Sequence, residues 1–340
     1  MYNFFLAFSR TLALAVLSLL FISDLSNGNS LNQNQSYILG PEYGTAGLES
    51  VRVDASFAIA TTILRPGPIL PVWLDYHLRW VHHVVIFMDD PDERPLFESL
   101  CGNRPVTLLD GSQVESRMTP ESRLIRRQMA NMRHAITYLM ERGYTWLIHI
   151  DLDELLFGPL VESRSWASDL EIGLVTFSNH EALPVDFETS NPFKDCVYFW
   201  VNGVDRNANF AAYGNGKSAV RLGPGVKPKG PHAFSGYTGR IFTPSDEEAM
   251  VLHYPYPSYN SWLLKFNHYG RFPDHWFGDR RGPKIIDFML QSRDVVQMAH
   301  KTNDWVSAKA FFSKRILDTN SRKEAINQGK IRQYTPFAES

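Results

Sequence analysis

An apolar run that ends in three acids limits what this chain can fold into more than any other stretch. Residues 146–157 read WLIHIDLDELLF. The first half predicts a buried β-strand, and the two-residue period of a strand puts His149, Asp151 and Asp153 on one face. Carboxylates held this close repel each other, and a hard divalent cation shared with phosphate oxygens keeps both ionised. The pattern therefore predicts a metal and diphosphate site.

A second interpretation of the same residues needs no metal. The sequence Asp-Leu-Asp-Glu also occurs as a helix N-cap followed by acids in the first helical turn, where the helix dipole favours negative charge. Glu154, which could be a third ligand, would then only cap the turn that follows. The residues of this stretch leave both interpretations open.

The size and charge of the chain exclude one class of partner. Its 340 residues are 44% hydrophobic and 13% aromatic, which suffices for a large core in one domain or two. The 34 basic and 36 acidic residues leave a formal charge of -2, and lysine and arginine do not gather in one block. We therefore expect no nucleic-acid partner.

The N-terminal region predicts targeting to the secretory pathway. Residues 4–22 are apolar except for Arg10, and residues 11–22 have the length of a signal-peptide core. A cleaved signal peptide and an uncleaved signal anchor both agree with this pattern, so the membrane is a partner only in the second case. We expect four parts: a signal peptide or anchor at 1–23, a flexible stem at 24–49, a folded domain at 50–320 and a polar tail at 321–340.

Two smaller features agree with a lumenal destination. Asn34-Gln35-Ser36 is a glycosylation sequon in a polar stretch, and the chain has an even pair of cysteines, Cys101 and Cys196. The cysteines predict either a disulfide or two buried thiols. Cysteine and histidine do not cluster at zinc spacing, so we expect no structural zinc.

Strands and helices alternate along the first half of the folded domain. Apolar runs predict strands at 57–64, 83–90, 105–110 and 173–177, and helical periodicity predicts a helix from Pro71 and another from Thr119 to Gly143. This alternation is typical of an α/β fold with a mainly parallel sheet flanked by helices. The acidic stretch then falls at the fourth strand. His77, on the apolar stripe of the first helix, is expected to be a core histidine.

Beyond Glu181 the pattern weakens into a loop-rich half that we expect to form binding sites. Short strands are predicted at 217–221 and 249–253. Helices are predicted at 261–268, 283–292 and 303–317.

A second pair of acids follows the second predicted strand. Asp89 and Asp90 come directly after an apolar run, and ligands of open parallel sheets bind outside the carboxyl ends of the strands. Either acid could hold a ribose or a base edge, and a solvated turn or helix cap explains them equally well. The next helix carries Arg123, Arg126 and Arg127 on its outer face, and one of them could reach a phosphate.

With these residues in hand, the chain resembles a GT-A fold glycosyltransferase, closest to the family 2-like and family 92 group. The resemblance covers residues 57–272 and has five parts. They are the helix Leu70-Pro71-Val72-Trp73-Leu74-Asp75-Tyr76-His77, the end of the second strand, the Trp-x-x-x-x-Asp-x-Asp-Glu segment, Lys217 to Arg221 leading to His232, and Leu252-His253-Tyr254-Pro255.

The resemblance implies a metal-dependent, hexosyltransferase-type enzyme. Asp151 and Asp153 would bind Mn²⁺ or Mg²⁺ on the diphosphate of a nucleotide sugar, a UDP- or GDP-sugar. His253 would lie near the metal or diphosphate, as a third metal ligand in the first case. Asp89 or Asp90 would face the nucleoside, while Lys217 and His232 would line the donor or acceptor site. Without the resemblance, Lys217 is an outward charge on an edge strand and His253 a packed residue.

The implied reaction moves a sugar to a hydroxyl of a glycan or glycoconjugate in the Golgi, where an uncleaved anchor makes a single-pass type II protein with a lumenal domain. Relatives are expected to invert the anomeric centre, which needs a carboxylate base. The sequence does not rank the candidates, which are Asp186, Asp274, Glu188, Asp279 and His180.

Two other classes remain open from sequence. A haloacid-dehalogenase-like phosphatase also has Asp-x-Asp after a strand, as nucleophile and acid. Such enzymes favour Thr or Val two residues after the second acid, where this chain has Leu155. A secreted, non-catalytic carbohydrate-binding domain needs only aromatic loops such as those with Trp262 and Trp276.

Overall fold

The structure is a computed structural model that describes residues 55–112, 120–202, 210–276 and 283–338, with side chains from residue 124 onward in the second range. The predicted signal or anchor, the stem, the sequon at Asn34 and the base candidate Asp279 lie outside the described residues. Among the helices that are described, none is both long and apolar enough to cross a membrane.

The larger sheet of the described chain has seven strands in the order β12-β6-β9-β4-β1-β2-β3. Strand β9 pairs antiparallel with β4 and β6, and the other neighbouring strands are parallel. The predicted α/β class with a mainly parallel sheet is confirmed. The strands are β1 (Phe57–Ile63), β2 (His83–Met88), β3 (Val106–Asp110), β4 (Trp146–His149), β6 (Ile172–Phe177), β9 (Lys217–Arg221) and β12 (Arg240–Phe242).

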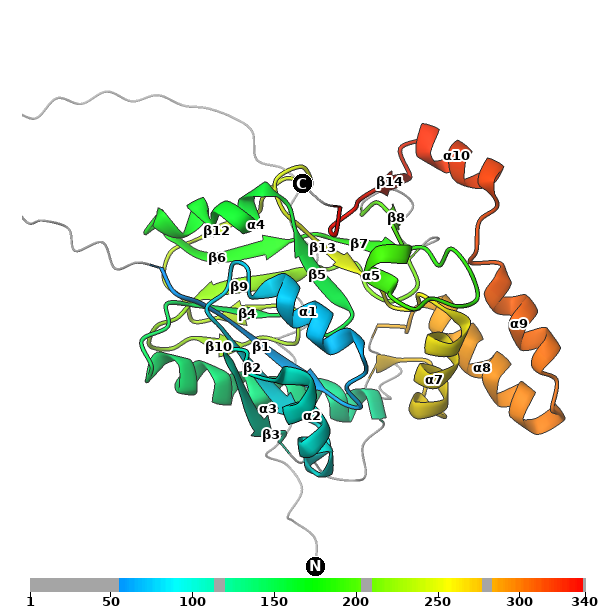
Figure 1. The fold of residues 1–340 in the computed structure, drawn as a ribbon, viewed down its shortest axis with the longest axis horizontal. Helices are drawn as coiled ribbons and strands as arrows, with labels where there is room; N and C mark the ends of the chain where they lie inside the picture. The colour runs from blue at the N-terminus through cyan, green and yellow to red at the C-terminus, as the bar shows by residue number, and fades with distance from the viewer. Residues whose placement is uncertain (1–54, 113–119, 203–209, 277–282, 339–340) are drawn as a thin grey trace, which may run out of the picture. The chain divides into compact units, whose positions relative to one another are not determined.

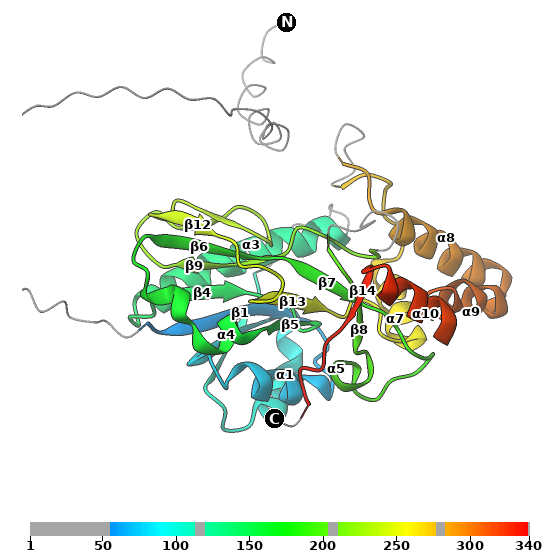
Figure 2. The same cartoon turned by 90° about the horizontal axis from the view of Figure 1, so that it is seen from above.

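Helices cover both faces of this sheet because alternate strand residues point to opposite sides. Helix α3 (Pro120–Met140) lies on one face, and α1 (Ile69–His77) and α2 (Arg94–Cys101) lie on the other, as Figures 1 and 2 show. Ala58 of β1 belongs to the apolar cluster under α3, whereas its neighbour Ile59 belongs to the cluster under α1. The sheet is therefore buried on both faces, which explains its continuous apolar strands.

A second, five-stranded sheet, which the sequence analysis did not predict, adjoins the first. Its order is β14-β8-β7-β13-β5. Along the described chain, the path passes from the first sheet to the second at three points, between β4 and β5, between β6 and β7 and between β12 and β13. The strands are β5 (Glu154–Phe157), β7 (Asn179–Ala182), β8 (Tyr198–Trp200), β13 (Met250–His253) and β14 (Ile331–Gln333).

Helix α1 is attached to strand β5, which forms an edge of the second sheet. The indole Nε1 of Trp73 donates to the carbonyl oxygen of Glu154 at 2.8 Å, and the hydroxyl of Tyr76 donates to that of Leu156 at 2.9 Å. The backbone N–H of Leu156 donates to Nε2 of His77 at 3.4 Å. Three side chains of one helix thus satisfy backbone groups that an edge strand would otherwise leave unpaired.

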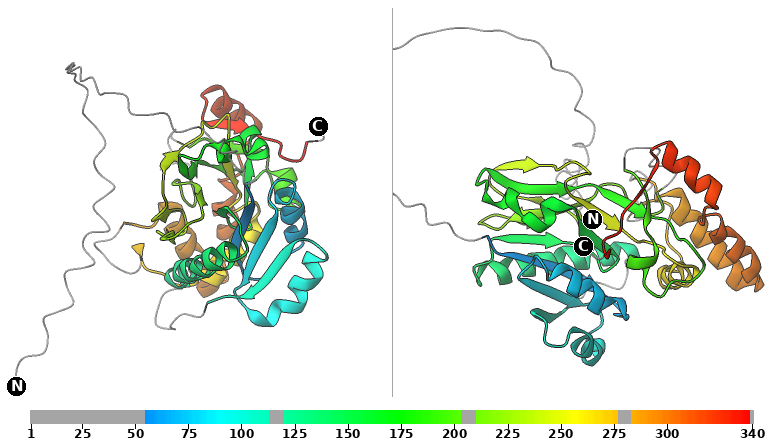
Figure 3. Two further views of the ribbon diagram at one scale, coloured as in Figure 1. Left: turned by 90° about the vertical axis from the view of Figure 1, so that its left-hand side faces the viewer. Right: turned by 45° about the horizontal axis from the view of Figure 1, so that its top comes forward.

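The C-terminal helices pack on a separate apolar cluster that includes Trp262, Phe266 and Phe312. These helices are α7 (Tyr259–Tyr269), α8 (Asp287–Thr302) and α9 (Trp305–Ser313), and the right-hand view of Figure 3 shows α8 and α9 in orange at one end of the domain. The last helix, α10 (Thr319–Asn327), packs through Ala325 on a smaller cluster with Leu183 and Ile331. Helix α8 begins later than the predicted Pro283. The reason is that Pro283 and Lys284 are extended: Lys284 bridges to His275, and the carbonyl of Pro283 accepts from Trp276.

The predicted C-terminal tail also contributes to the fold. Strand β14 lies within it and pairs antiparallel with β8. The folded unit therefore extends beyond residue 320. The remaining short elements are η2 (Pro91–Glu93), α4 (Pro159–Ser163), η3 (Ser165–Ser168), α5 (Pro192–Asp195), β10 (Lys227–Pro228) and β11 (Phe234–Ser235).

The structure answers two questions that the sequence raised about buried side chains: whether the two cysteines pair, and whether His77 is a core residue. Cys101 and Cys196 are buried free thiols, which decides between the two predictions for them. His77 is fully buried, and its Nδ1 lies 2.9 Å from the carbonyl oxygen of Trp73. Since Nε2 accepts from Leu156, Nδ1 donates to Trp73, and the neutral ring is satisfied at both nitrogens.

The hydrogen bond from Trp73 to strand β5 predicts a specific loss of stability. Trp73→Phe should lower the free energy of unfolding by about 1–3 kcal/mol more than Trp80→Phe, because only the first leaves a buried carbonyl without its donor. Trp80 is the matched control: it is also buried, and its Nε1 has no hydrogen-bond partner among the described residues. Urea denaturation of both variants measures the difference, and equal losses would contradict the role given to Trp73.

The neutral state of His77 predicts a dependence of stability on pH. Burial lowers the pKa of His77 to about 3, so the unfolded chain takes up a proton more readily than the folded one. The contribution is complete above about pH 6.5 and is lost as the pH falls from there toward 3. Between pH 7 and pH 5, wild type should lose about 2 kcal/mol more than His77→Gln. Exposed His300→Gln, as the control, should follow wild type; a His77→Gln profile parallel to wild type would refute the assignment.

Candidate functional site

The Asp-x-Asp segment forms the turn that connects the two sheets. Strand β4 ends at His149 and β5 begins at Glu154. The backbone N–H of Asp151 donates to Oε2 of Glu154 at 2.7 Å, and the N–H of Glu154 donates to the carbonyl oxygen of Asp151 at 3.1 Å. Glu154 therefore closes the turn, as one sequence interpretation proposed, although a strand and not a helix follows. The side chains of Asp151 and Asp153 keep 27% and 29% of their surface exposed.

Lys217 reaches the turn because β9 runs antiparallel to β4. The first residue of β9 consequently lies at the carboxyl end of β4, and its Nζ lies 2.6 Å from Oδ2 of Asp151. The same ammonium group is 3.3 Å from Oε2 of Glu154, and the lysine side chain is only 1% exposed. Gln128 of α3 donates to the other oxygen of Asp151 at 2.8 Å. Asp151 is thus held from two elements.

The charges around Asp151 decide its ionisation. Burial opposes the charged form, but the nearby ammonium of Lys217 outweighs it and holds the pKa of Asp151 below its usual value. Burial likewise opposes the charge on Lys217, and Asp151 and Glu154 together raise the pKa of its ammonium. Both members of the pair are therefore ionised at neutral pH.

Asp153 has a different cationic partner, which sequence reasoning missed. Nζ of Lys265, from α7, lies 2.6 Å from Oδ2 of Asp153, and Nε2 of His253 lies 3.8 Å from the same oxygen. Burial raises the pKa of Asp153, but Lys265 and His253 lower it by more, to well below its usual value. Lys265 occupies an ordinary helical position 112 residues after Asp153, so no local pattern indicates the contact.

His253 lies between two buried acids, Glu154 and Glu181, on neighbouring strands of the second sheet. The register pairs His253 of β13 with Glu154 of β5 on one side and with Glu181 of β7 on the other. Burial lowers the pKa of His253, but Asp153 and Glu181 raise it by more, to about 9. The imidazole is therefore a cation at neutral pH. Glu181 accepts the backbone N–H groups of Ala211, Ala212 and Tyr213 at 2.6, 2.9 and 3.1 Å.

Glu154 is the most deeply buried acid of the turn. Burial raises its pKa to about 7, against the opposing effect of Lys217. Its Oε1 accepts the hydroxyl of Tyr213, and Oε2 accepts the backbone N–H of Asp151. These contacts enclose Glu154 behind the two aspartates, so it supports the turn and does not face solvent.

Two other histidines line the site in the neutral form. His232, which the resemblance placed at the donor or acceptor site, packs its ring on Tyr213 at 4.5 Å between centroids. Burial and then Lys217 lower the pKa of His232 to about 3, and burial lowers that of His149 to about 4. The His253 ring packs on Tyr213 at 4.6 Å. Tyr213 thus connects the two predicted histidines of the site.

The acids after β2 are engaged elsewhere on the same sheet edge. Arg127 of α3 forms a two-bond ion pair with Asp89, at 2.5 and 2.8 Å. Asp90 caps the 3-10 turn that follows by accepting the N–H of Asp92 at 3.0 Å. Asp90 therefore has the helix-cap geometry that sequence allowed, whereas Asp89 and Arg127 form a charged pair near the carboxyl edge.

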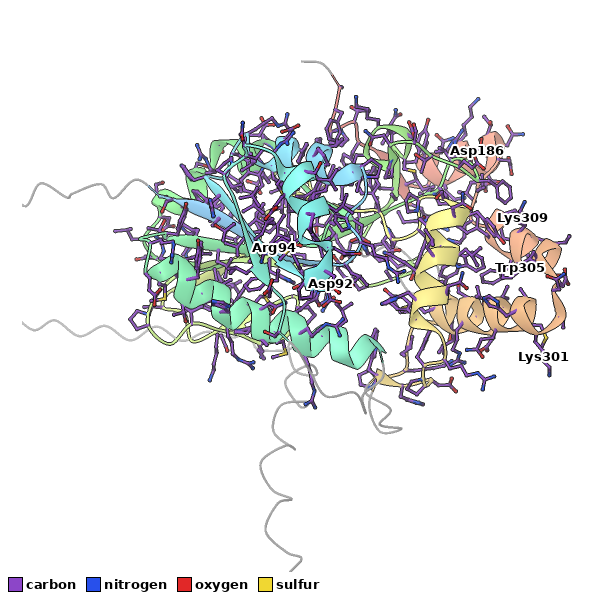
Figure 4. All side chains as sticks on the ribbon, turned by 60° about the horizontal axis from the view of Figure 1, so that its bottom comes forward. Asp92, Arg94, Asp186, Lys301, Trp305 and Lys309 are labelled. Atoms are coloured by element: carbon purple, nitrogen blue, oxygen red, sulfur yellow. The ribbon has the colours of Figure 1, made fainter. Side chains whose placement is uncertain are left out.

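None of the described base candidates joins the turn. Asp186 is exposed and accepts the N–H of Phe187, and Figure 4 shows it at the end of the domain that carries Lys309 and Trp305. Asp274 is 61% exposed and pairs with Arg293 at 2.9 Å. The other two described candidates are also elsewhere: Glu188 lines a surface hollow with Lys309, and His180 is buried 3.4 Å from Asp246.

The donor atoms of the turn suit a hard divalent cation. Mg²⁺-type sites commonly use one or two carboxylates together with substrate phosphates, and Asp151 and Asp153 are two carboxylates that both keep exposed surface. Within the described ranges, three or more His, Cys, Asp or Glu side chains do not converge in a ready-made metal cage. The two carboxylates are about equally exposed, and Asp153 differs in having a partner, Lys265, that is itself partly exposed.

Comparison with known proteins gives two glycosyltransferase-like relatives, both from Arabidopsis thaliana. One is 31% identical over 155 residues, which cover 39% of this chain and 30% of the relative. The other is 28% identical over 155 residues, which cover 39% of this chain and 34% of the relative. The chain thus matches about a third of the length of these curated relatives. No protein-family model matches the chain.

Among solved structures, 4-diphosphocytidyl-2C-methyl-D-erythritol synthase from Anaerococcus prevotii aligns with a TM-score of 0.31 and 9% identity. The alignment covers 57% of this chain and 91% of that protein. A similarity at this TM-score carries no inference about fold or function, and the α/β assignment here depends on the strand order itself.

The different burial of the two lysines predicts different losses of stability. Lys217→Met should lower the free energy of unfolding by about 3–5 kcal/mol, because it leaves two acids beside each other without their cation. Lys265→Met should cost about 1 kcal/mol or less, since that pair is partly exposed. Urea denaturation at pH 7 measures both, and similar losses in the two variants would contradict the structure.

Proposed function

We propose that this chain is a metal-dependent glycosyltransferase with a GT-A fold, which moves a sugar from a nucleotide sugar to a hydroxyl of a glycan or glycoconjugate with inversion. The observation that carries the proposal is the Asp-x-Asp turn at the carboxyl edge of the sheet, where Lys217, Lys265 and His253 surround its acids. The similarity to glycosyltransferase-like proteins supports the same class.

The proposed reaction explains why cations gather at this turn. The acceptor oxygen bonds to the anomeric carbon, the bond from that carbon to the phosphate oxygen breaks, and its electron pair remains on the diphosphate. The acceptor proton passes to a base. Among the described residues, none of the base candidates lies at the turn. Cationic groups aimed at the diphosphate stabilise the charge that develops there.

Mn²⁺ or Mg²⁺, held by Asp151 and Asp153, would supply further positive charge to the leaving diphosphate. The chain's own residues prepare that site: Lys217 and Gln128 fix Asp151 in one orientation. The row of Glu181, His253 and Glu154 sets the position of β13 and β5 behind Asp153.

The remaining parts of the proposal follow from the sequence. The donor is a UDP- or GDP-sugar, with Asp89 near the nucleoside because it lies at the same carboxyl edge as Asp151. His232 faces the bound donor or acceptor beside Tyr213. The proposal includes entry into the secretory pathway, which the apolar N-terminal segment supports, as a Golgi membrane protein if the segment is uncleaved and as a secreted one if it is cleaved.

Binding of nucleoside diphosphate is the first test. Calorimetry with UDP and GDP should detect binding to wild type in Mn²⁺ and not in EDTA. Asp153→Asn and Asp151→Asn should each weaken that binding at least about 10-fold, since each removes a charged ligand. Asp92→Asn is the control, because Asp92 is exposed on the turn after β2 (Figure 4) and this variant should bind as wild type does.

Three results would count against this function. Binding that is equal with and without metal would remove the metal requirement, and equal binding in all variants would remove the role of the turn. Release of phosphate from a phosphomonoester, lost in Asp151→Asn, would instead indicate the phosphatase class. A screen of nucleotide-sugar hydrolysis then identifies the sugar.

A further inference from the structure

Two lysines pair with the aspartates of the turn at the same distance but in opposite surroundings. Both Nζ atoms lie 2.6 Å from a carboxylate oxygen. The side chain of Lys217 is 1% exposed, whereas that of Lys265 is 34% exposed. The side chain of Lys265 therefore reaches the protein surface, whereas that of Lys217 does not.

Lys217 is enclosed by the protein. Its ammonium lies between Asp151 at 2.6 Å and Glu154 at 3.3 Å, and Glu154 is fully buried. A donor could recruit Lys217 only by drawing its charge away from the buried carboxylate, and an uncompensated buried charge is strongly unfavourable. Lys217 is thus suited to hold Asp151, the carboxylate it contacts, in place.

Lys265 has a fixed base and a side chain that is partly exposed. Helix α7 begins with a capping box between Ser258 and Ser261, and Nε1 of Trp262 donates to Oγ of Ser292 at 3.0 Å. These contacts anchor the helix that carries Lys265. Its ammonium bonds Asp153, an acid that is itself 29% exposed, and lies 5.3 Å from the centre of the Tyr256 ring. The head group can therefore exchange one oxygen anion for another without leaving a buried charge unpaired.

We propose that Lys265 binds the diphosphate of the nucleotide-sugar donor, and that Lys217 only positions Asp151 without touching the donor. This inference rests on the proposed function and reverses the role that the sequence suggested for Lys217. In the free protein Lys265 neutralises Asp153. When the donor is bound, the ammonium contacts a phosphate oxygen, and it remains there as negative charge develops on the leaving group.

The test compares diphosphates with monophosphates. Calorimetry in Mn²⁺ measures the binding of UDP and UMP, and of GDP and GMP, to wild type and to Lys265→Met. The variant should bind the diphosphate that wild type prefers about 10- to 100-fold more weakly, since it lacks one charge-assisted contact. Its affinity for the matching monophosphate should change by less than about 3-fold, because the contact is to the second phosphate.

Three further variants distinguish the effect of the Lys265 charge from a general loss of folded structure. Lys265→Arg keeps the charge and should restore diphosphate binding to within about 5-fold of wild type. Lys265→Gln gives a second neutral variant, and it replaces Lys265→Met in the comparison if thermal unfolding shows that the Met variant is not folded. Lys309→Met removes an exposed lysine from α9 (Figure 4) and should bind as wild type does.

The possible results are distinguishable. If wild type binds no nucleoside diphosphate in Mn²⁺, the proposed function fails and this inference fails with it. If wild type binds and the neutral variants bind equally well, Lys265 does not contact the donor, while the proposed function stands. An equal loss for diphosphate and monophosphate would also overturn the inference, because it indicates a general disturbance of the site.

Discussion

The ammonium group of Lys217 lies between Asp151 and Glu154, where the two sheets of the domain meet. The turn from β4 to β5 removes much of the surface of its carboxylates from water, and groups in such surroundings stay charged only beside a cation or several hydrogen bonds. Lys217 supplies that cation, because antiparallel β9 brings its first residue to the end of β4. This contact, together with the hydrogen bond from Gln128, fixes Asp151 at the edge of the first sheet.

A second constraint acts from the opposite side of the turn. Trp73, Tyr76 and His77 all bond to the backbone of β5, so helix α1 fixes the strand on which the turn ends. Together these contacts hold the Asp-x-Asp segment between a helix, two strands of the first sheet and an edge strand of the second. A site that must bind charged groups repeatedly gains from such a rigid frame, since little reorganisation is needed on binding.

Sequence reasoning succeeded where the signal is local. The apolar runs located β1, β2, β4 and β6, and the short pattern at residues 217–221 located β9. It also selected Trp73, Tyr76 and His77 as a motif, although only the structure shows that all three bond to β5. It failed where pairing is long-range: β5 follows β4 after a turn of a few residues, and nothing in the sequence says that the chain changes sheets there. Lys265 and Glu181 were missed for the same reason, because their partners are distant in the chain.

The order of charges along the chain has a consequence for how the site forms. The acids Asp151, Asp153 and Glu154 all precede their cations Lys217, His253 and Lys265. During synthesis from the N-terminus, the three carboxylates leave the ribosome well before any of the groups that neutralise them. The buried part of the acidic turn therefore has to remain hydrated until β9 has delivered Lys217, and the second sheet can form around β5 only after its partner β13 has been made.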